Sequence, residues 1–188
     1  VPLIKIMEQA GKPHPKRIQA VVGQNINLHP ALFNLKRMGP HFAVVGPPLS
    51  GKTTTLYSWV LSLTQRFSPE QIMIVLIDLQ QRFILYGGEQ RLDELPHVVT
   101  AVTDVEQIDA LVSNLKSECR HLAAEDNERE LFVFIDNFDD FAEEVERMRD
   151  AARDLAGIAR RYGRDGLHFI AAGALDSSSE LRRRIQQN

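Results

Sequence analysis

The sequence predicts an α/β fold in which a mainly parallel central sheet is covered by helices on both faces. Short runs such as Ile72–Ile77 and Leu131–Ile135 are apolar at every position, which is typical of strands buried on both faces. Segments with apolar residues at helical spacing separate these runs, and strands that alternate with helices form parallel sheets. The length of 188 residues and the 44% share of apolar residues are those of about one soluble globular domain.

The first 40 residues are expected to form a lead-in segment that packs on the core. Residues 7–18 are polar and contain two prolines, so we expect an irregular stretch there, followed by a short strand at Gln19–Val22. The charge is uneven, because residues 1–52 hold seven Lys/Arg and one acidic residue, whereas the remainder has a net charge of −9. A basic segment of this kind either faces phosphate groups or is a solvated arm, and both interpretations stay open.

The core is expected at residues 41–176, and a polar tail at 177–188. Its expected strands are the apolar runs at His41–Val45, Ile72–Ile77, Val98–Val102, Leu131–Ile135 and Leu167–Ala172. Thr103 and Glu106 have the spacing of a capping box, so a helix is expected to begin at Thr103. Apolar residues at helical spacing predict one long helix through Phe141 and Tyr162. Ligands of such folds bind beyond the carboxyl ends of the strands, where Gly46, Asp78 and Asp136 fall.

A glycine-rich segment after the first core strand carries the most specific motif in the chain. It matches the Walker A pattern G-x-x-x-x-G-K-[ST] at every fixed position. Lys52 supplies a positive charge for the β and γ phosphates of ATP, Thr53 offers a hydroxyl to Mg²⁺, and Thr54 lies beside the α phosphate. The predicted ATP-binding residues are Gly46, Pro47, Pro48, Leu49, Ser50, Gly51, Lys52, Thr53 and Thr54.

An acidic residue at the end of the strand Leu131–Ile135 is the expected partner of this loop. Asp136 is predicted to hold Mg²⁺ through water, although a carboxylate there also caps a following helix. Many P-loop ATPases place a Glu next, but this chain has Asn137, which cannot accept the proton of the attacking water. Asp139 either substitutes for that Glu or stabilises the helix N-terminus. We therefore expect ATP–Mg²⁺ binding with slow or no hydrolysis.

Three arginines gather where the long predicted helix ends. Arg160, Arg161 and Arg164 complement the helix dipole there. Alternatively, they contact the phosphates bound by a neighbouring subunit, as an arginine finger does.

Several segments, in their order along the chain, resemble the FtsK/SpoIIIE class of P-loop ATPases. The resemblance is strongest to the ATPase domains of type VII secretion motors (the EccC/EssC family), in particular to their later, degenerate domains. Besides the Walker A segment, it is carried by Gly39–Gly46, Leu95–Val98 followed by Asp104–Glu106, Ile135–Asp139 and Gly163–His168.

The resemblance implies a RecA-like fold with ATP and Mg²⁺ as cofactors. It also implies tandem copies of the domain in one membrane-anchored chain, at the cytoplasmic face of the membrane. Its partners would be neighbouring ATPase domains or subunits in a ring or tandem array, and small helical secretion substrates. Two departures matter: Asn137 breaks the acidic pair, and Ala172-Gly173 stands where DNA translocases carry a polar sensor.

Two other functions stay open. One is a DNA-translocating ATPase of the FtsK type, which the basic first third favours and the net charge of −9 over the remainder opposes. The other is a degenerate P-loop module that serves as a partner-binding domain. No apolar run approaches the roughly 20 residues that span a bilayer, and the chain begins at Val1 rather than Met. We therefore expect a soluble module of a longer chain.

Overall fold

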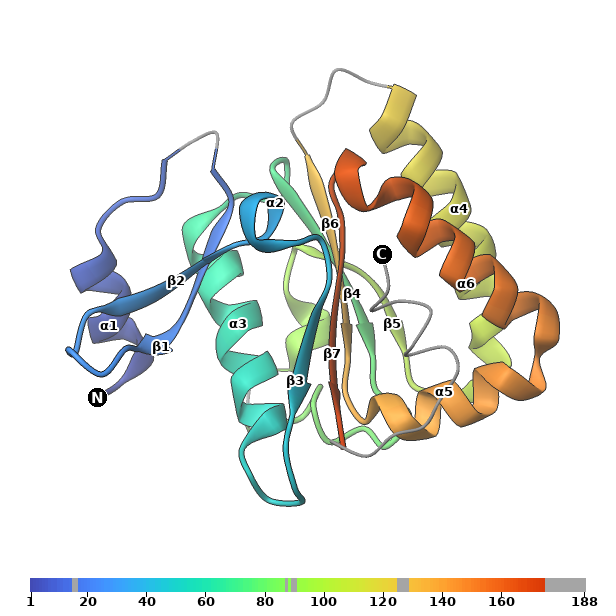
Figure 1. The fold of residues 1–188 in the computed structure, drawn as a ribbon, viewed down its shortest axis with the longest axis horizontal. Coiled ribbons are helices and arrows are strands. Elements are labelled where there is room, and N and C mark those ends of the chain that lie inside the picture. Colours follow the sequence, from blue (N-terminus) through green and yellow to red (C-terminus); the bar gives the residue numbers. More distant parts are fainter. Residues whose placement is uncertain (15–16, 87, 89–90, 125–128, 175–188) are drawn as a thin grey trace.

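The computed structural model confirms the predicted α/β class. It describes residues 1–14, 17–86, 88, 91–124 and 129–174, so the predicted polar tail at 177–188 lies outside the described residues. The described part contains a small antiparallel sheet near the N-terminus and a five-stranded parallel sheet in the centre (Figure 1). No helix in these described ranges is long and apolar enough to cross a membrane.

The central sheet has the strand order β3-β7-β6-β4-β5. Its strands are β3 (Phe42–Val45), β4 (Ile72–Ile77), β5 (Val98–Val102), β6 (Glu130–Ile135) and β7 (Leu167–Gly173). Because all neighbouring strands are parallel, their carboxyl ends meet at one edge of the sheet, the lower edge in Figure 1. Strand β7 lies between β3 and β6, and it therefore separates the glycine-rich segment that follows β3 from Asp136 by one strand.

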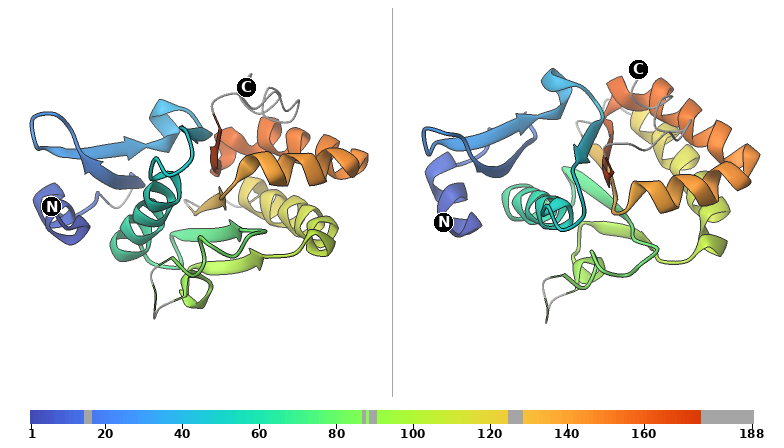
Figure 2. Two further views of the ribbon diagram at one scale, coloured as in Figure 1. Left: turned by 90° about the horizontal axis from the view of Figure 1, so that it is seen from below. Right: turned by 60° about the horizontal axis from the view of Figure 1, so that its bottom comes forward.

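Helices cover both faces of this sheet (Figures 1 and 2). One face carries α3 (Lys52–Arg66), and the other carries α4 (Ile108–Ala124), α5 (Phe138–Arg147) and α6 (Arg149–Tyr162). Alternate residues of β4 point to opposite faces, so Ile74 packs with the α3 side and Val75 with the α4 side. This two-sided burial explains why β4 is apolar at every position and β6 at every position after Glu130.

The N-terminal segment contains more regular structure than the sequence indicated. Residues 7–10, expected to be irregular, belong to helix α1 (Leu3–Ala10), and the expected short strand is the longer β1 (Gln19–Gln24). Two further elements were not predicted, β2 (Pro30–Asn34) and the short helix α2 (Leu35–Met38). Ile6 and Met7 form a small buried cluster with Val21 of β1, and this tertiary contact stabilises a helix too short to form alone.

The β1–β2 hairpin packs on α3 through its first strand. Ala20 and Ile18 lie in the same buried cluster as Leu56, Trp59 and other residues of α3. The backbone N–H of Val21 donates a hydrogen bond of 2.7 Å to Ser62 Oγ on α3, and both residues are buried. The hairpin thus covers the outer side of α3, the helix that follows the glycine-rich segment.

The predicted cap of the α4 segment is shifted by one residue. Asp104, not Thr103, is the N-cap, and its carboxylate accepts a hydrogen bond from the Glu106 N–H at 2.9 Å. Gln107 closes the capping box, because its Oε1 accepts bonds from the N–H groups of Thr103 and Asp104. The first turn is a 3₁₀-helix, η2 (Val105–Gln107), which continues into α4.

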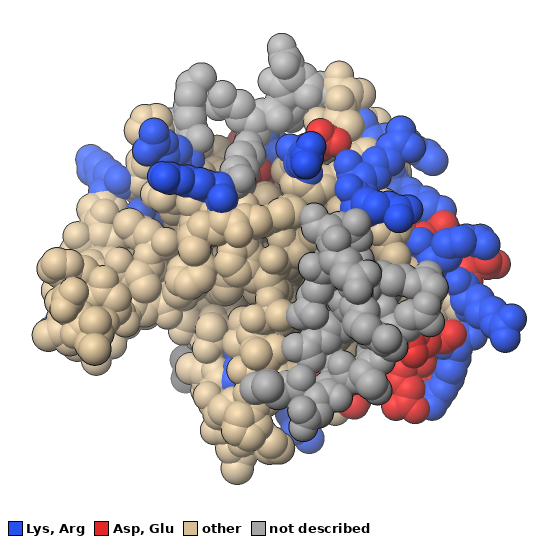
Figure 3. Space-filling model, in the orientation of Figure 1, with Lys and Arg blue, Asp and Glu red and all other residues tan. Residues whose placement is uncertain are grey.

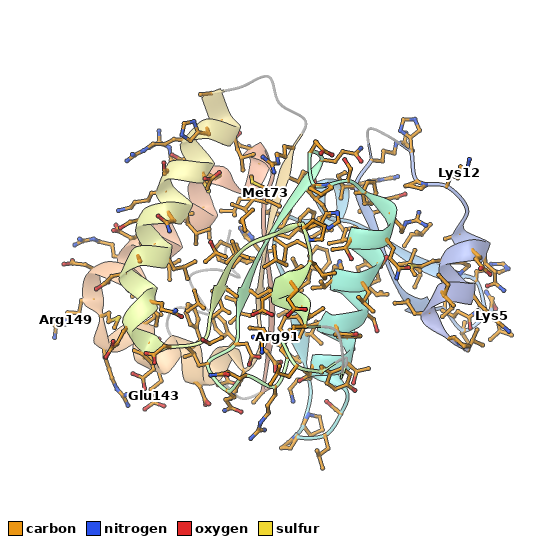
Figure 4. The ribbon with its side chains drawn as sticks, turned by 180° about the vertical axis from the view of Figure 1, so that it is seen from behind. Lys5, Lys12, Met73, Arg91, Glu143 and Arg149 are labelled. Carbon is orange, nitrogen blue, oxygen red and sulfur yellow. The ribbon has the colours of Figure 1, made fainter. Side chains whose placement is uncertain are left out.

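The prediction of one long helix through Phe141 and Tyr162 was wrong, because the segment forms two helices. Met148, with φ −96° and ψ 77°, leaves the helical region and separates α5 from α6. One straight helix over both segments would be about 37 Å long, which exceeds the roughly 23 Å of a seven-residue strand. The break lets both helices bury an apolar face on one sheet, while Glu143 and Arg149 point outward (Figure 4).

A largely buried polar cluster joins the start of β3 to the amino end of β7. His168 Nδ1 donates to the Pro40 carbonyl at 3.0 Å, and its Nε2 lies 3.2 Å from Glu130 Oε2. His41 Nδ1 accepts the Phe169 N–H at 3.1 Å, so its Nε2 carries the proton and donates to the Ala159 carbonyl at 3.1 Å. Burial lowers the pKa of His41 from 6.5 to about 4, which keeps this ring neutral at neutral pH.

Two glycines of the α6 region should respond oppositely to alanine. A Cβ at Gly163 would lie 3.0 Å from the ring atoms Cβ and Cγ of Pro40, so we expect Gly163→Ala to destabilise the fold by about 1–3 kcal/mol. Gly157 has no neighbour within 4 Å of such a Cβ, so Gly157→Ala in α6 should stabilise by about 0.5–1 kcal/mol. Chemical denaturation measures both; equal effects of the two variants would contradict this packing.

His41 should make stability depend on pH. Its folded pKa lies below its unfolded value, so only the unfolded state binds the proton between pH 6.5 and about 4, and stability falls as the pH drops through that window. From pH 8 to pH 5 the loss from this group is about 2 kcal/mol. The non-titrating His41→Gln variant should lack it, so the difference between wild type and variant in unfolding free energy should shrink toward pH 5. A difference independent of pH would contradict the assignment.

Candidate functional site

The glycine-rich loop, residues 46–53, connects β3 to α3 at the carboxyl edge of the sheet. A Cβ at Gly46 would lie 2.5 Å from Ser50 Oγ, so the absence of a side chain there lets the loop close on itself. Gly51 has φ 87°, a left-handed conformation that glycine adopts without strain. Leu49 also has a positive φ, of 62°, and its side chain is fully exposed. The loop is therefore held in a tightly curled backbone conformation.

Lys52 is folded back onto this loop. Its Nζ donates hydrogen bonds to the carbonyl oxygens of Gly46, at 2.9 Å, and Pro47, at 2.8 Å. Neutral carbonyls are weaker acceptors than an anion, so a phosphate group would compete successfully for this ammonium.

Thr53 joins the loop to the end of β6. Its Oγ1 lies 3.1 Å from both Oδ1 and Oδ2 of Asp136, to which it donates. Burial raises the pKa of Asp136, the Thr53 hydrogen bond opposes that rise, and the nearby charge of Asp78 adds to it. A carboxylate in this position is stabilised by a cation, and oxygen ligands in small number suit Mg²⁺. The oxygen atoms of Thr53 and Asp136 are therefore of the kind that could hold a magnesium ion here.

Asp78, which also follows a strand of the central sheet, binds the backbone of its own chain. It is 1% exposed, and its Oδ2 accepts the backbone N–H groups of Phe83, at 2.8 Å, and Ile84, at 2.9 Å. It therefore fixes the turn that follows β4.

A cavity of about 630 Å³ opens above the glycine-rich loop, within the usual size range of ligand sites. Its lining comes from the loop, the start of α3, the ends of β6 and β7, and the segment after β4. The residues are Gly46, Pro48, Leu49, Ser50, Gly51, Lys52, Thr53, Thr54, Gln80, Arg82, Tyr86, Asp136, Asn137, Asp139, Gly173 and Ala174. Most of the predicted site residues thus meet at one place.

Five of these lining residues were not among the predicted binding residues, although Gly173 belongs to the pair that stands where DNA translocases carry a polar sensor. Gln80, Arg82 and Tyr86 follow β4, whereas Gly173 is the last residue of β7 and Ala174 follows it. Their position after strands of a parallel sheet is the one signal that would have indicated them, because such ends share an edge.

Asn137 and Asp139 line the cavity but are engaged by other groups. Asn137 has φ 50° and ψ 61°, and its Nδ2 donates to Asp140 Oδ2 at 2.6 Å. Asp139 Oδ2 accepts the Ala174 N–H at 2.6 Å. A Cβ at Gly173 would lie 3.1 Å from the same Oδ2, so a side chain at that position would crowd Asp139.

The three arginines lie far from this cavity. Arg160 and Arg161 are in the last turn of α6, and Arg164 is in the 3₁₀-helix η3 (Gly163–Asp165), which leads into the amino end of β7. They therefore occupy the edge of the sheet opposite the glycine-rich loop. Figure 3 shows basic side chains gathered over α6 at this side of the molecule. The fold does not bring these arginines to the site of their own chain.

Comparison with known proteins places these features in context. Residues 5–125 match the model of the FtsK/SpoIIIE family. The chain is 26% identical over 152 residues to the ESX-1 secretion system protein EccCb1 of Mycolicibacterium smegmatis, covering 66% of this chain and 25% of that protein. It is 28% identical over 170 residues to the type VII secretion system protein EssC of Staphylococcus aureus, covering 79% of this chain and 11% of that protein.

Solved structures show the same fold. A structure of Thermomonospora curvata EccC, which holds ATPases 2 and 3 in complex with a signal sequence peptide, superposes with a TM-score of 0.71 at 20% identity, over 96% of this chain and 34% of that one. ATPases 2 and 3 of EssC from Geobacillus thermodenitrificans give a TM-score of 0.70 at 20% identity, over 93% and 37%. This chain thus corresponds in length to about a third of each.

Proposed function

Because the chain belongs to the FtsK/SpoIIIE family, we propose that it is an ATP–Mg²⁺-binding domain of a type VII-like protein secretion motor, in which nucleotide binding is coupled to translocation or its regulation. The observation that carries this proposal is the cavity above the glycine-rich loop, which collects Lys52, Thr53 and Asp136 from two separate strand ends. The chain spans 25% of EccCb1 and 11% of EssC, so the activity of a whole motor is part of the proposal.

Each residue of the site has a role in this proposal. Backbone N–H groups of the glycine-rich loop and the N-terminus of α3 bind the phosphates, and Lys52 exchanges its carbonyl partners for phosphate oxygens. Thr53 and Asp136 hold Mg²⁺, directly or through water. When bound, Mg²⁺ neutralises part of the phosphate charge.

The proposed assembly follows from the position of the arginines and from the relatives. Arg160, Arg161 and Arg164 lie at the edge opposite their own cavity, so any contact they make with phosphate is with a site on a neighbouring domain or subunit. The solved EccC and EssC structures each hold two ATPases, which supports a tandem or ring arrangement of such domains. We further propose a place at the cytoplasmic face of the membrane within a longer anchored chain, with small helical proteins as substrates.

ATP–Mg²⁺ should stabilise the chain through this site. A ligand at 100 times its Kd adds about 2.7 kcal/mol, which corresponds to a rise in Tm of about 5–10 °C for this length. Lys52→Ala should remove most of the rise, because the ammonium no longer binds phosphate. Lys116→Ala, on α4 and paired with Asp154, is the matched control and should keep it. A thermal shift series with and without ATP–Mg²⁺ measures this; no rise in the wild type would refute nucleotide binding.

Hydrolysis by the isolated chain should be slow. The side chains of Asn137 and Asp139 are held by Asp140 and by the Ala174 N–H, and an amide cannot accept a proton from water. Loss of a general base costs about 10²–10⁴-fold, so we expect about 0.1 turnovers per second or fewer against an enzyme median of about 10. A steady-state phosphate-release assay measures it, with Asp136→Ala as background. Several turnovers per second, lost in Asp136→Ala, would contradict the expectation.

A further inference from the structure

The segment that follows β4 forms an aromatic wall of the cavity. Asp78 accepts the N–H groups of Phe83 and Ile84, and both of these side chains are almost fully buried in the core on the α3 face. Tyr86 lies two residues after Ile84, and its N–H donates to the Phe83 carbonyl at 3.2 Å. Tyr86 is therefore held at the cavity by a buried anchor.

Tyr86 has the features of a contact residue for an aromatic ligand. Tyr86 lines the cavity, and the residue is 48% exposed. The ring packs against Tyr57 of α3, with centroids 5.3 Å apart and an interplanar angle of 53°. Its hydroxyl forms a 2.6 Å hydrogen bond with Thr54 Oγ1. The packing against Tyr57 and the hydrogen bond to Thr54 orient the ring at the cavity.

The cavity has two chemically different ends. Consecutive residues of α3 point in different directions, because a helix turns about 100° per residue. Thr53 bonds to Asp136 at the end of β6, where charged groups collect, and Thr54 bonds to Tyr86 on the segment after β4. A nucleoside triphosphate has the same two ends, a charged triphosphate and an aromatic base.

We propose that Tyr86 is the platform on which the nucleobase stacks, so that the site selects nucleoside triphosphates over inorganic polyphosphate. This inference rests on the proposed nucleotide binding and adds the residue that recognises the base. Arg82, exposed on the same segment, lines the same wall of the cavity. Base–aromatic stacking makes a contribution that corresponds to about 5- to 150-fold in affinity.

The test compares two probes that share the phosphates and differ in the base. Isothermal titration calorimetry with ATP–Mg²⁺ and with tripolyphosphate–Mg²⁺ should show tighter binding of ATP to the wild type. Tyr86→Ala should weaken ATP binding by about 5- to 150-fold and leave tripolyphosphate unchanged. Tyr86→Phe keeps the ring and should retain ATP affinity. Leu85→Ala, an exposed neighbour that does not line the cavity, is the matched control and should change neither.

The outcomes separate this inference from the proposed function. A wild type that binds neither probe refutes both. Binding of tripolyphosphate as tight as that of ATP leaves the phosphate site standing and refutes the platform. If Tyr86→Ala weakens the binding of both probes, the Tyr86 hydroxyl acts on the phosphates through Thr54. If it strengthens the binding of both, the hydrogen bond to Thr54 closes the site. Either result overturns the inference. Should the alanine variant not fold, Tyr86→Leu keeps apolar contact with Tyr57 and should show the same selective loss.

Discussion

The parallel arrangement of the five central strands is the constraint on which the rest of the molecule depends. Parallel strands end at the same edge, so the segments that follow β3, β4, β6 and β7 are brought together although they lie far apart in the chain. The insertion of β7 between β3 and β6 leaves room between the glycine-rich loop and Asp136, which Thr53 bridges. The cavity is a consequence of this topology, because its lining comes from segments that follow the strands of the sheet.

At the opposite edge of the sheet, polar contacts hold the start of β3 against β7 and α6. There, His168, Pro40 and Glu130 form a buried contact, and His41 is held neutral between two backbone groups. Gly163 closes this corner because a side chain would meet Pro40. The end of the lead-in segment is therefore fixed to the core by hydrogen bonds of His168 and His41, and the three arginines near this corner are exposed.

At the site itself, small local requirements decide which side chains are free. Asn137 occupies a left-handed conformation, which Asn tolerates better than Glu, and this preference explains why the usual second acid has no easy place there. Gly173 provides space for Asp139, which in turn holds the Ala174 N–H. The side chains of Lys52, Thr53 and Thr54 all form hydrogen bonds with other groups of the protein. A ligand that binds these side chains therefore has to replace existing hydrogen bonds.

The sequence by itself determined the features that are local. The apolar runs of β4 and β6, and the glycine-rich loop with Lys52, follow from residue type and spacing, because burial on two faces and a tight turn are encoded within a few neighbours. Only the tertiary structure decided that the helix breaks at Met148, that α1 forms on β1, and that Tyr86 meets Thr54 across 32 residues. These outcomes depend on the length of the sheet and the order of its strands, and no local pattern of residues specifies either quantity.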